Sequence, residues 1–136
     1  MIVLDASVAL KWFIDEEGSE SARRILLDLQ ESPTEFIVPE LFFIEMLSVL
    51  SRYGLTVKQL AGHMESLESL GIQRISLGQE LMLKACEIIS ETKISAYDAV
   101  YAATAFLCKG IWITADKTAH LKISKFKISK ILENIA

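Results

Sequence analysis

The chain has 136 residues, of which 51% are hydrophobic and 24% are charged, and its net charge at pH 7 is −4. This length and composition predict a single folded domain spanning residues 1–136 and exclude an intrinsically disordered chain. No apolar run reaches the roughly 18 residues that a membrane-spanning helix needs. The opening segment 1–5 lacks the basic start of a signal peptide and soon meets an acid. We therefore expect a cytoplasmic protein.

Short apolar segments alternate with segments of helical periodicity along the chain. The pattern predicts strands at 2–5, 35–38, 72–76, 111–114 and 126–131. It predicts helices at 6–14, 19–31, 39–53, 56–70, 76–91, 95–109 and 115–121, with Pro39 in the first turn of the third and Ser76 capping the fifth. Strands that alternate with helices favour a parallel sheet with helices on both faces. We therefore expect an α/β fold, a three-layer α/β/α sandwich with a mostly parallel central sheet.

Two aspartates follow predicted strands. Asp5 ends the first strand, and Asp116 lies two residues beyond the fourth, in Thr114-Ala115-Asp116. In a parallel sheet the carboxyl ends of the strands form the ligand-binding edge, so both carboxylates are expected there. The structural alternative is that each aspartate only caps the helix that follows it.

Glu45 is the only charged residue within the apolar segment 41–50. A helix that is apolar around its whole circumference is expected to be buried, and an unpaired buried carboxylate costs several kcal/mol. The sequence therefore predicts a compensating cation, which is either a metal ion or a basic residue such as Arg52. Ser48 lies three residues after Glu45, on the same face of the predicted helix.

Asp98 lies near the start of another apolar helix, in a stretch without other charges between Lys93 and Lys109. Here too a capping role, with Ser95 in a capping box, is the structural alternative. Four carboxylates that converge in a dry site need a cation to neutralise them. Carboxylate oxygens suit Mg²⁺ or Mn²⁺, and such ions serve in the hydrolysis of phosphodiester bonds.

These residues carry a family resemblance. The motifs are 3–7 (VLDAS), 39–41 (PEL) leading to Glu45, 97–103 (YDAVYAA) and 114–116 (TAD). In this order and at this length, the chain resembles the PIN domain family, and within it the VapC-type toxins of bacterial and archaeal toxin–antitoxin pairs. The resemblance spans nearly the whole chain and implies a PIN-like α/β/α sandwich with the activity of a divalent-metal-dependent endoribonuclease.

The resemblance assigns roles to individual residues. It implies that Asp5, Glu45, Asp98 and Asp116 form the catalytic acidic quartet, with Ser7 and Thr114 as supporting hydroxyls. Asp5, Asp98 and Asp116 would hold Mg²⁺ or Mn²⁺, and Glu45 would position or deprotonate the attacking water and could reach the ion through water. The family usually has Asn three residues after the helical Glu, where this chain has Ser48 in the supporting position.

The expected partners are an RNA substrate, a second copy of the chain and a cognate antitoxin. A mean hydropathy of +0.36 is high for a small domain and indicates that a partner covers apolar surface. A run of lysines without an acid extends over 117–130 and is either a solvated face or an edge that contacts phosphate. The alternative to a ribonuclease is a non-catalytic PIN-like module that binds RNA or protein.

Overall fold

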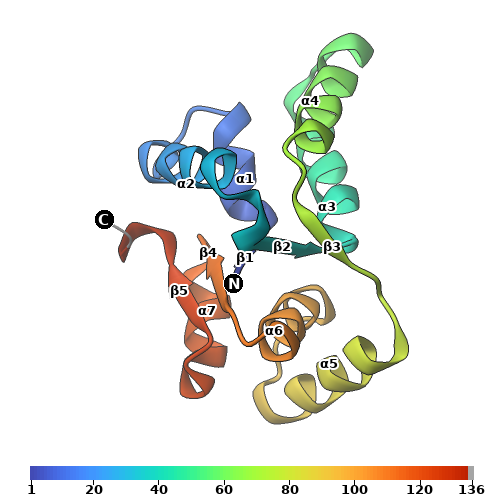
Figure 1. The fold of residues 1–136 in the computed structure, drawn as a ribbon, viewed down its shortest axis with the longest axis vertical. Coiled ribbons are helices and arrows are strands. Elements are labelled where there is room, and N and C mark those ends of the chain that lie inside the picture. Colours follow the sequence, from blue (N-terminus) through green and yellow to red (C-terminus); the bar gives the residue numbers. More distant parts are fainter. Residues whose placement is uncertain (135–136) are drawn as a thin grey trace.

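Five short strands form one parallel sheet in the computed structural model, which describes residues 1–134 (Figure 1). The strand order is β3-β2-β1-β4-β5, and every neighbouring pair is parallel. The strands are β1 (Ile2–Leu4), β2 (Phe36–Pro39), β3 (Gln73–Ile75), β4 (Ile111–Thr114) and β5 (Ser129–Ile131). Because β1 lies in the middle, between β2 and β4, the residue that follows it sits at the centre of the carboxyl edge.

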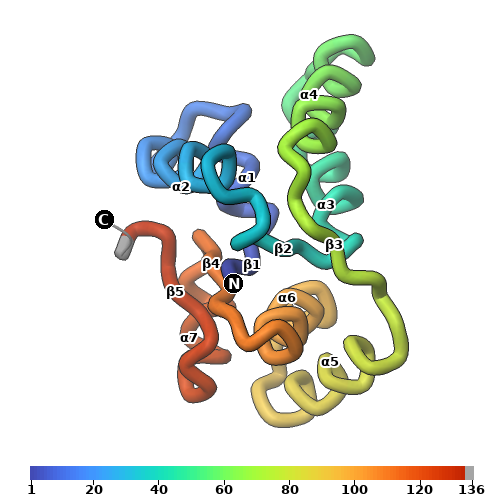
Figure 2. Tube along the Cα trace, viewed as in Figure 1, coloured from blue at the N-terminus to red at the C-terminus, as the bar shows by residue number. Residues whose placement is uncertain are grey.

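Helices cover both faces of the sheet, as predicted, so the α/β/α sandwich is confirmed (Figures 1 and 2). The helices are α1 (Ala6–Phe13), α2 (Ser19–Glu31), α3 (Leu41–Leu50), α4 (Val57–Ser69), α5 (Gln79–Thr92), α6 (Ala96–Cys108) and α7 (Lys117–Ile123). The pair α1 and α2 lies on one face, and α5 and α6 lie on the other. No helix within residues 1–134 is long and apolar enough to cross a membrane.

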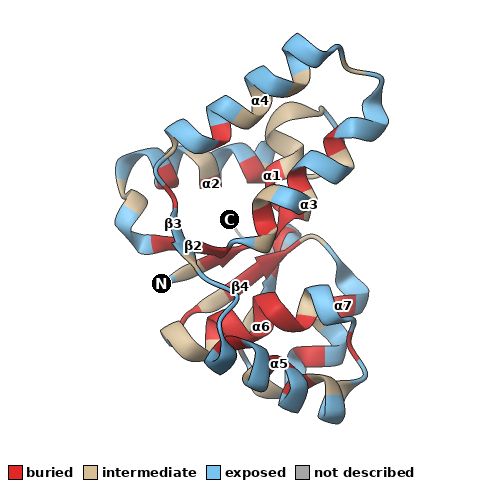
Figure 3. Ribbon diagram, turned by 90° about the vertical axis from the view of Figure 1, so that its right-hand side faces the viewer, coloured by how far each residue is buried: buried red, intermediate tan, exposed pale blue. Residues whose placement is uncertain are grey.

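The core is centred on β1, β4 and α6 (Figure 3). Every residue of α6 from Ala99 to Ala105 is buried, and the helix packs against β1, β2 and β4. Its run of alanines lets the helix lie close to the sheet, and Tyr101 fills the remaining space against Trp112 of β4. The first turn of α6, which carries Asp98, is thereby held beside the central strands.

Two predicted helix starts are wrong. Pro39 is the last residue of β2 rather than part of a helix, because its fixed φ suits a strand end and the next N–H, from Glu40, continues the bonding to Ile75 at 3.0 Å. Ser76 does not cap α5, which begins at Gln79 after Gly78. By contrast, the predicted caps at Thr56 and Ser95 are confirmed.

Two further expectations differ from the structure. Helix α3 is buried on one side only, because α1, α4 and β2 cover Phe42 and Met46 while Ile44 is 66% exposed. The last strand is shorter than predicted, since residues Ser124–Phe126 form a 3₁₀ turn and Lys127 adopts a left-handed conformation with φ 55°. The apolar spacing of this segment therefore reflects packing of a turn rather than strand alternation.

The junction between α6 and β4 depends on Gly110. A Cβ atom at this position would collide with the backbone carbonyl of Met1, whereas a Cβ atom at Gly62, in the middle of α4, would meet nothing within 4 Å. We predict that Gly110→Ala lowers the free energy of unfolding by about 1–3 kcal/mol, as overpacking does. Gly62→Ala should raise it by about 0.5–1 kcal/mol, because alanine is the better helix former. Urea denaturation of both variants checks this, and a neutral Gly110→Ala would contradict it.

Candidate active site

The Asp5 carboxylate is buried where β1 ends and α1 begins, with only 7% of the residue exposed. Its Oδ2 atom accepts hydrogen bonds from the backbone N–H of Ser7, at 3.1 Å, and from the Ser7 hydroxyl. Its Oδ1 atom accepts a hydrogen bond from the indole N–H of Trp112, at 3.2 Å. Asp5 thus caps α1, as the structural alternative predicted, and the same bonds hold its carboxylate at the carboxyl edge of the sheet.

Ser7 and Thr114 join the two central strand ends. The Ser7 hydroxyl donates to Asp5 and accepts from the N–H of Ala115 at 3.0 Å, and its oxygen lies 3.4 Å from Oγ1 of Thr114. Thr114 in turn accepts from the N–H of Asp116, at 3.0 Å. The two hydroxyl side chains therefore form a short bridge from Asp5 to the segment that carries Asp116.

Asp116 and Asp98 lie at the starts of α7 and α6. Asp116 is exposed and caps α7 by accepting from the N–H of Ala119 at 3.1 Å, so its capping role is confirmed. Asp98 differs, because Ser95 caps α6 by accepting from the backbone N–H of Asp98 at 3.1 Å, and the Asp98 side chain accepts no hydrogen bond from a backbone N–H within residues 1–133. The reciprocal capping box suggested for Asp98 is thus absent from the described part of the chain.

Glu45 lies halfway along α3, half-buried beneath the carboxyl edge. Within residues 1–133 it forms no ion pair, neither with Arg52 nor with another cation, and its Oε1 atom is buried without a hydrogen-bond partner. Ser48 does not hold it: this residue is exposed, and its carbonyl accepts from the hydroxyl of Ser51 at 2.7 Å. No side chain within residues 1–133 therefore supplies the compensating cation that the sequence predicts for Glu45.

The electrostatics link the four acids to one another. Burial raises the pKa of the Glu45 carboxyl to about 7; the Tyr101 hydroxyl opposes the rise, and the charges of Asp5 and Asp98 add to it. Burial likewise raises the pKa of Asp98 to about 6, and the charges of Asp5 and Asp116 contribute to that rise. Burial also raises the pKa of Asp5, against the hydrogen bonds from Ser7 and Trp112. The acids are thus close enough to repel, and the site favours bound protons or a cation.

The chemistry of the donor groups fits a hard divalent cation, because they are carboxylates and hydroxyls. The Oε1 atom of Glu45, which has no hydrogen-bond partner, is one of them. As placed, however, the His, Cys, Asp and Glu side chains of the described residues form no group of three that could hold a metal ion. Ligation by three carboxylates therefore requires side-chain rotations, for which the half-buried Asp98 and the exposed Asp116 have room.

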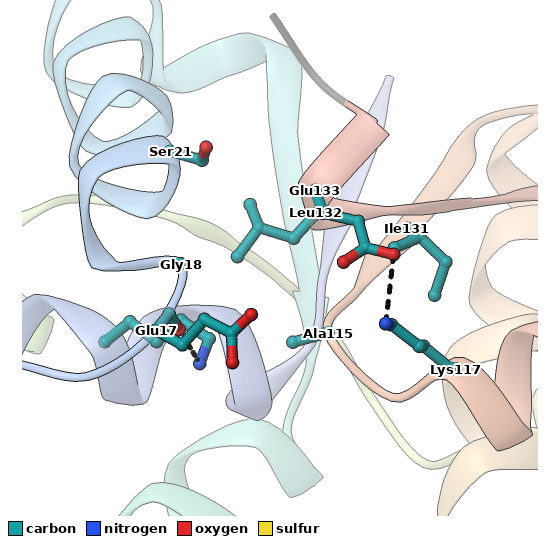
Figure 4. A pocket seen from close by; sticks show the side chains of 9 residues that line it. Glu17, Gly18, Ser21, Ala115, Lys117, Ile131, Leu132 and Glu133 are labelled. Carbon is teal, nitrogen blue, oxygen red and sulfur yellow. Dashed lines mark hydrogen bonds and ion pairs between the residues drawn. The ribbon is translucent and has the colours of Figure 1, made fainter.

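Two pockets flank the acids. One, of about 280 Å³, contains Glu45 and is lined by Leu41, Ile44, Glu45, Ser48, Val49, Arg52 and Tyr97. The other, of about 290 Å³, lies beside the ends of β4 and β5 and is drawn in Figure 4, where Lys117 pairs with Glu133 at 3.2 Å. Its lining includes Ala115 and Lys117, the neighbours of Asp116 in the sequence. Only the first pocket contains one of the four acids. It is therefore the better candidate for the approach of a substrate.

Two residues near the acids escaped the sequence reasoning. Trp112 appeared only as part of an apolar strand, and Tyr101 appeared only within an apolar helix and the motif 97–103, without a role of its own. The structure places the indole N–H of Trp112 on Asp5 and the Tyr101 hydroxyl beside Glu45. The usable signal was their polar atoms, because a buried Tyr or Trp in a core position generally needs a hydrogen-bond partner.

These features define an α/β sandwich with an acid cluster at the carboxyl edge of a parallel sheet. A family model described as the PIN domain matches residues 2–124, so the chain belongs to the PIN domain family. The resemblance seen in the sequence motifs is thereby confirmed. No curated protein sequence matches the chain.

Solved structures share the fold at low sequence identity. A toxin–antitoxin complex from Klebsiella pneumoniae matches with a TM-score of 0.72 and 15% identity, covering 97% of this chain and 98% of that chain. FitAcB from Neisseria gonorrhoeae matches with a TM-score of 0.73 and 20% identity, covering 96% of each chain. A FitAB complex bound to a DNA fragment matches with a TM-score of 0.80 and 19% identity, covering 100% of this chain and 98% of that chain. The fold is thus that of these proteins.

The raised pKa values predict how stability depends on pH without metal. The folded-state pKa values of Glu45, about 7, and Asp98, about 6, lie above their ordinary values of 4.5 and 3.8, so between about pH 4 and pH 7 the folded chain binds more protons than the unfolded chain. The stabilisation from these two groups is therefore complete below about pH 4 and is lost as pH rises to about 7.

Glu45→Gln, which imitates the protonated side chain, should remove the Glu45 share of this loss. In EDTA its free energy of unfolding relative to wild type should increase between about pH 5 and about pH 7.5, as urea denaturation measures. Glu35→Gln, at an exposed position outside the acid cluster, serves as the control. A difference for Glu45→Gln that stays constant over this range would contradict the prediction.

Proposed function

We propose that the chain is a divalent-metal-dependent endoribonuclease that hydrolyses RNA phosphodiester bonds and acts as the toxin of a toxin–antitoxin pair. The proposal rests chiefly on the surroundings of Glu45. Its carboxylate has no cationic partner within residues 1–133, and the charges of Asp5 and Asp98 add to the rise in its pKa. Membership of the PIN domain family and the toxin–antitoxin origin of structures with this fold support it.

Each acid of the site has a role in the proposed reaction. Asp5, Asp98 and Asp116 are the candidates for holding Mg²⁺ or Mn²⁺, with Ser7 and Thr114 fixing the strand ends that carry two of them. Bound there, the ion would offset negative charge on the phosphate oxygens in the transition state. Glu45, with a pKa of about 7, suits a general base that orients and deprotonates the attacking water.

RNA also needs cations on the protein that contact its backbone. Lys122, in α7, lies near enough to Asp98 for its charge to oppose the burial-driven rise in the pKa of that carboxyl. It is exposed and forms no ion pair with any residue between 1 and 134, unlike Lys117 and Lys125. Within the lysine run, Lys122 is therefore the strongest candidate for a phosphate contact beside the acids.

The proposal includes an antitoxin and a second copy of the chain as protein partners, and the cytoplasm as the compartment. Large apolar side chains are exposed in several places, including Leu27 at 61%, Val57 at 86% and Leu121 at 71%. Apolar surface of this kind favours association. The Klebsiella pneumoniae relative is described as a toxin–antitoxin complex, which supports a similar assembly here.

We predict that Asp5→Asn, Glu45→Gln and Asp98→Asn each lower RNA cleavage in Mg²⁺ or Mn²⁺ by about 10²-fold or more, because each removes a placed charge from the reaction centre. Cleavage of a labelled single-stranded RNA measures the effect. Asp28→Asn is the matched control, since Asp28 is an exposed aspartate on α2, outside the acid cluster. Activity that survives EDTA in a clean preparation would rule out the metal-dependent mechanism.

Lys122→Gln tests the contact with the RNA backbone. We expect KM for RNA to rise several-fold with kcat nearly unchanged, and the slope of log affinity against log salt to fall by about 1, as the loss of one phosphate contact requires. Lys58→Gln, on the exposed surface of α4, is the control. Equal KM values and salt slopes for the two variants would place the RNA elsewhere.

A further inference from the structure

A stacked aromatic pair lies directly beneath the acids. The rings of Tyr101, in α6, and Trp112, in β4, are 6.0 Å apart between centroids, with an angle of 9° between their planes. Both side chains are almost fully buried, at 1% and 0% exposure. Helix α6 and strand β4, which carry the two rings, are largely buried (Figure 3). Their polar atoms are consequently held in fixed places.

The indole N–H of Trp112 completes the hydrogen bonding of Asp5. Ser7 occupies Oδ2 of this carboxylate and Trp112 occupies Oδ1, so both oxygens are fixed and the plane of the carboxylate is set. The other tryptophan, Trp12, satisfies its N–H on the backbone carbonyl of Ala22, at 2.8 Å. A buried indole can thus be satisfied by a backbone carbonyl, and the pairing of Trp112 with an acid of the cluster is a specific arrangement.

The Tyr101 hydroxyl is the second polar atom of the pair. Its oxygen is buried without a hydrogen-bond partner among residues 1–133, and so is Oε1 of Glu45. The hydroxyl nevertheless lies near enough to Glu45 to interact with its carboxylate. A buried hydroxyl without a hydrogen-bond partner costs about 1–3 kcal/mol, so its presence beside the unpartnered Oε1 atom of Glu45 needs an explanation.

We propose that Trp112 and Tyr101 are positioning residues that set the orientation of the Asp5 and Glu45 carboxylates for the divalent ion and the attacking water. Trp112 holds Asp5 through a hydrogen bond from its indole N–H. Tyr101 donates a hydrogen bond from its hydroxyl to the Glu45 carboxylate when the Glu45 side chain turns toward the site. Because the two rings stack, the two carboxylates are also held relative to one another. The inference rests on the proposed function, because the two residues act by orienting two of the acids that this function requires.

Matched pairs of variants test the proposal. Trp112→Phe removes the N–H beside the acids, and Trp12→Phe removes the N–H bound to a backbone carbonyl. Tyr101→Phe removes the buried hydroxyl, and Tyr53→Phe removes the hydroxyl of a tyrosine that is 44% exposed and lies outside the Glu45 pocket. Calorimetric titration with Mn²⁺ gives metal affinity, and RNA cleavage gives kcat and KM.

We expect Trp112→Phe and Tyr101→Phe to weaken Mn²⁺ binding by about 10-fold or more, as the loss of residues that orient metal ligands does. Each should lower kcat and leave KM for RNA near the wild-type value. Trp12→Phe and Tyr53→Phe should match wild type in Mn²⁺ affinity. In EDTA, Tyr101→Phe should melt no lower than wild type, because it removes a hydroxyl that has no partner. A purely structural role for Tyr101 would leave Mn²⁺ affinity unchanged.

A spectroscopic measurement covers the case in which Trp112→Phe does not fold. The chain has two tryptophans, so Trp12→Phe leaves Trp112 as its only one. In this background, Mn²⁺ should change the tryptophan emission with the same midpoint as the calorimetric titration, and adding Asp5→Asn should abolish the response. A Trp12→Phe protein that binds Mn²⁺ while its Trp112 emission stays constant would overturn the role of Trp112.

The outcomes separate this inference from the proposed function. If wild type binds Mn²⁺ and cleaves RNA, but Trp112→Phe and Tyr101→Phe do so equally well, the inference is wrong and the proposed function stands. If wild type neither binds Mn²⁺ nor cleaves RNA, both are wrong. Reduced affinity and kcat in these two variants alone would support the inference.

Discussion

The buried carboxylate of Asp5 is the constraint around which the site is organised. It ends the central strand, caps α1 and accepts the Ser7 hydroxyl and the Trp112 indole. Moving it would therefore disturb a helix start, the bridge to β4 and the core stack together. Its charge also acts on Glu45 and Asp98, where it adds to the rise in pKa that burial causes.

The same arrangement explains why the site tolerates so much repulsion. Packing of α6 against β1, β2 and β4 is apolar and tight, and it holds Asp98 and Tyr101 beside the acids. The favourable burial of this helix offsets the cost of crowding carboxylates at the edge of the sheet. The repulsion is confined to a few carboxylates that the packed core holds in place. A bound cation would relieve this repulsion and thereby stabilise the folded chain.

The structures with the same fold share only 15–20% of their residues with this chain. A parallel sheet with helices on both faces demands apolar residues at particular places and accepts many substitutions among them. Ser48 illustrates the freedom at the periphery: it lies exposed on α3 without contacting Glu45 through its hydroxyl, while a buried tyrosine from another helix stands beside that carboxylate instead.

The sequence by itself determined the order of strands and helices, the parallel sheet and the placement of Asp5 and Asp116 at strand ends, because these follow from local periodicity and from the geometry of parallel strands. It did not determine where β2 ends at Pro39 or which side of α3 is exposed, since neighbouring elements decide both. The joining of Trp112 to Asp5, 107 residues apart, was likewise decided by tertiary structure alone. Hydrogen bonds between distant side chains depend on how β1 and β4 pair and on how α6 packs, and no local pattern encodes that distance.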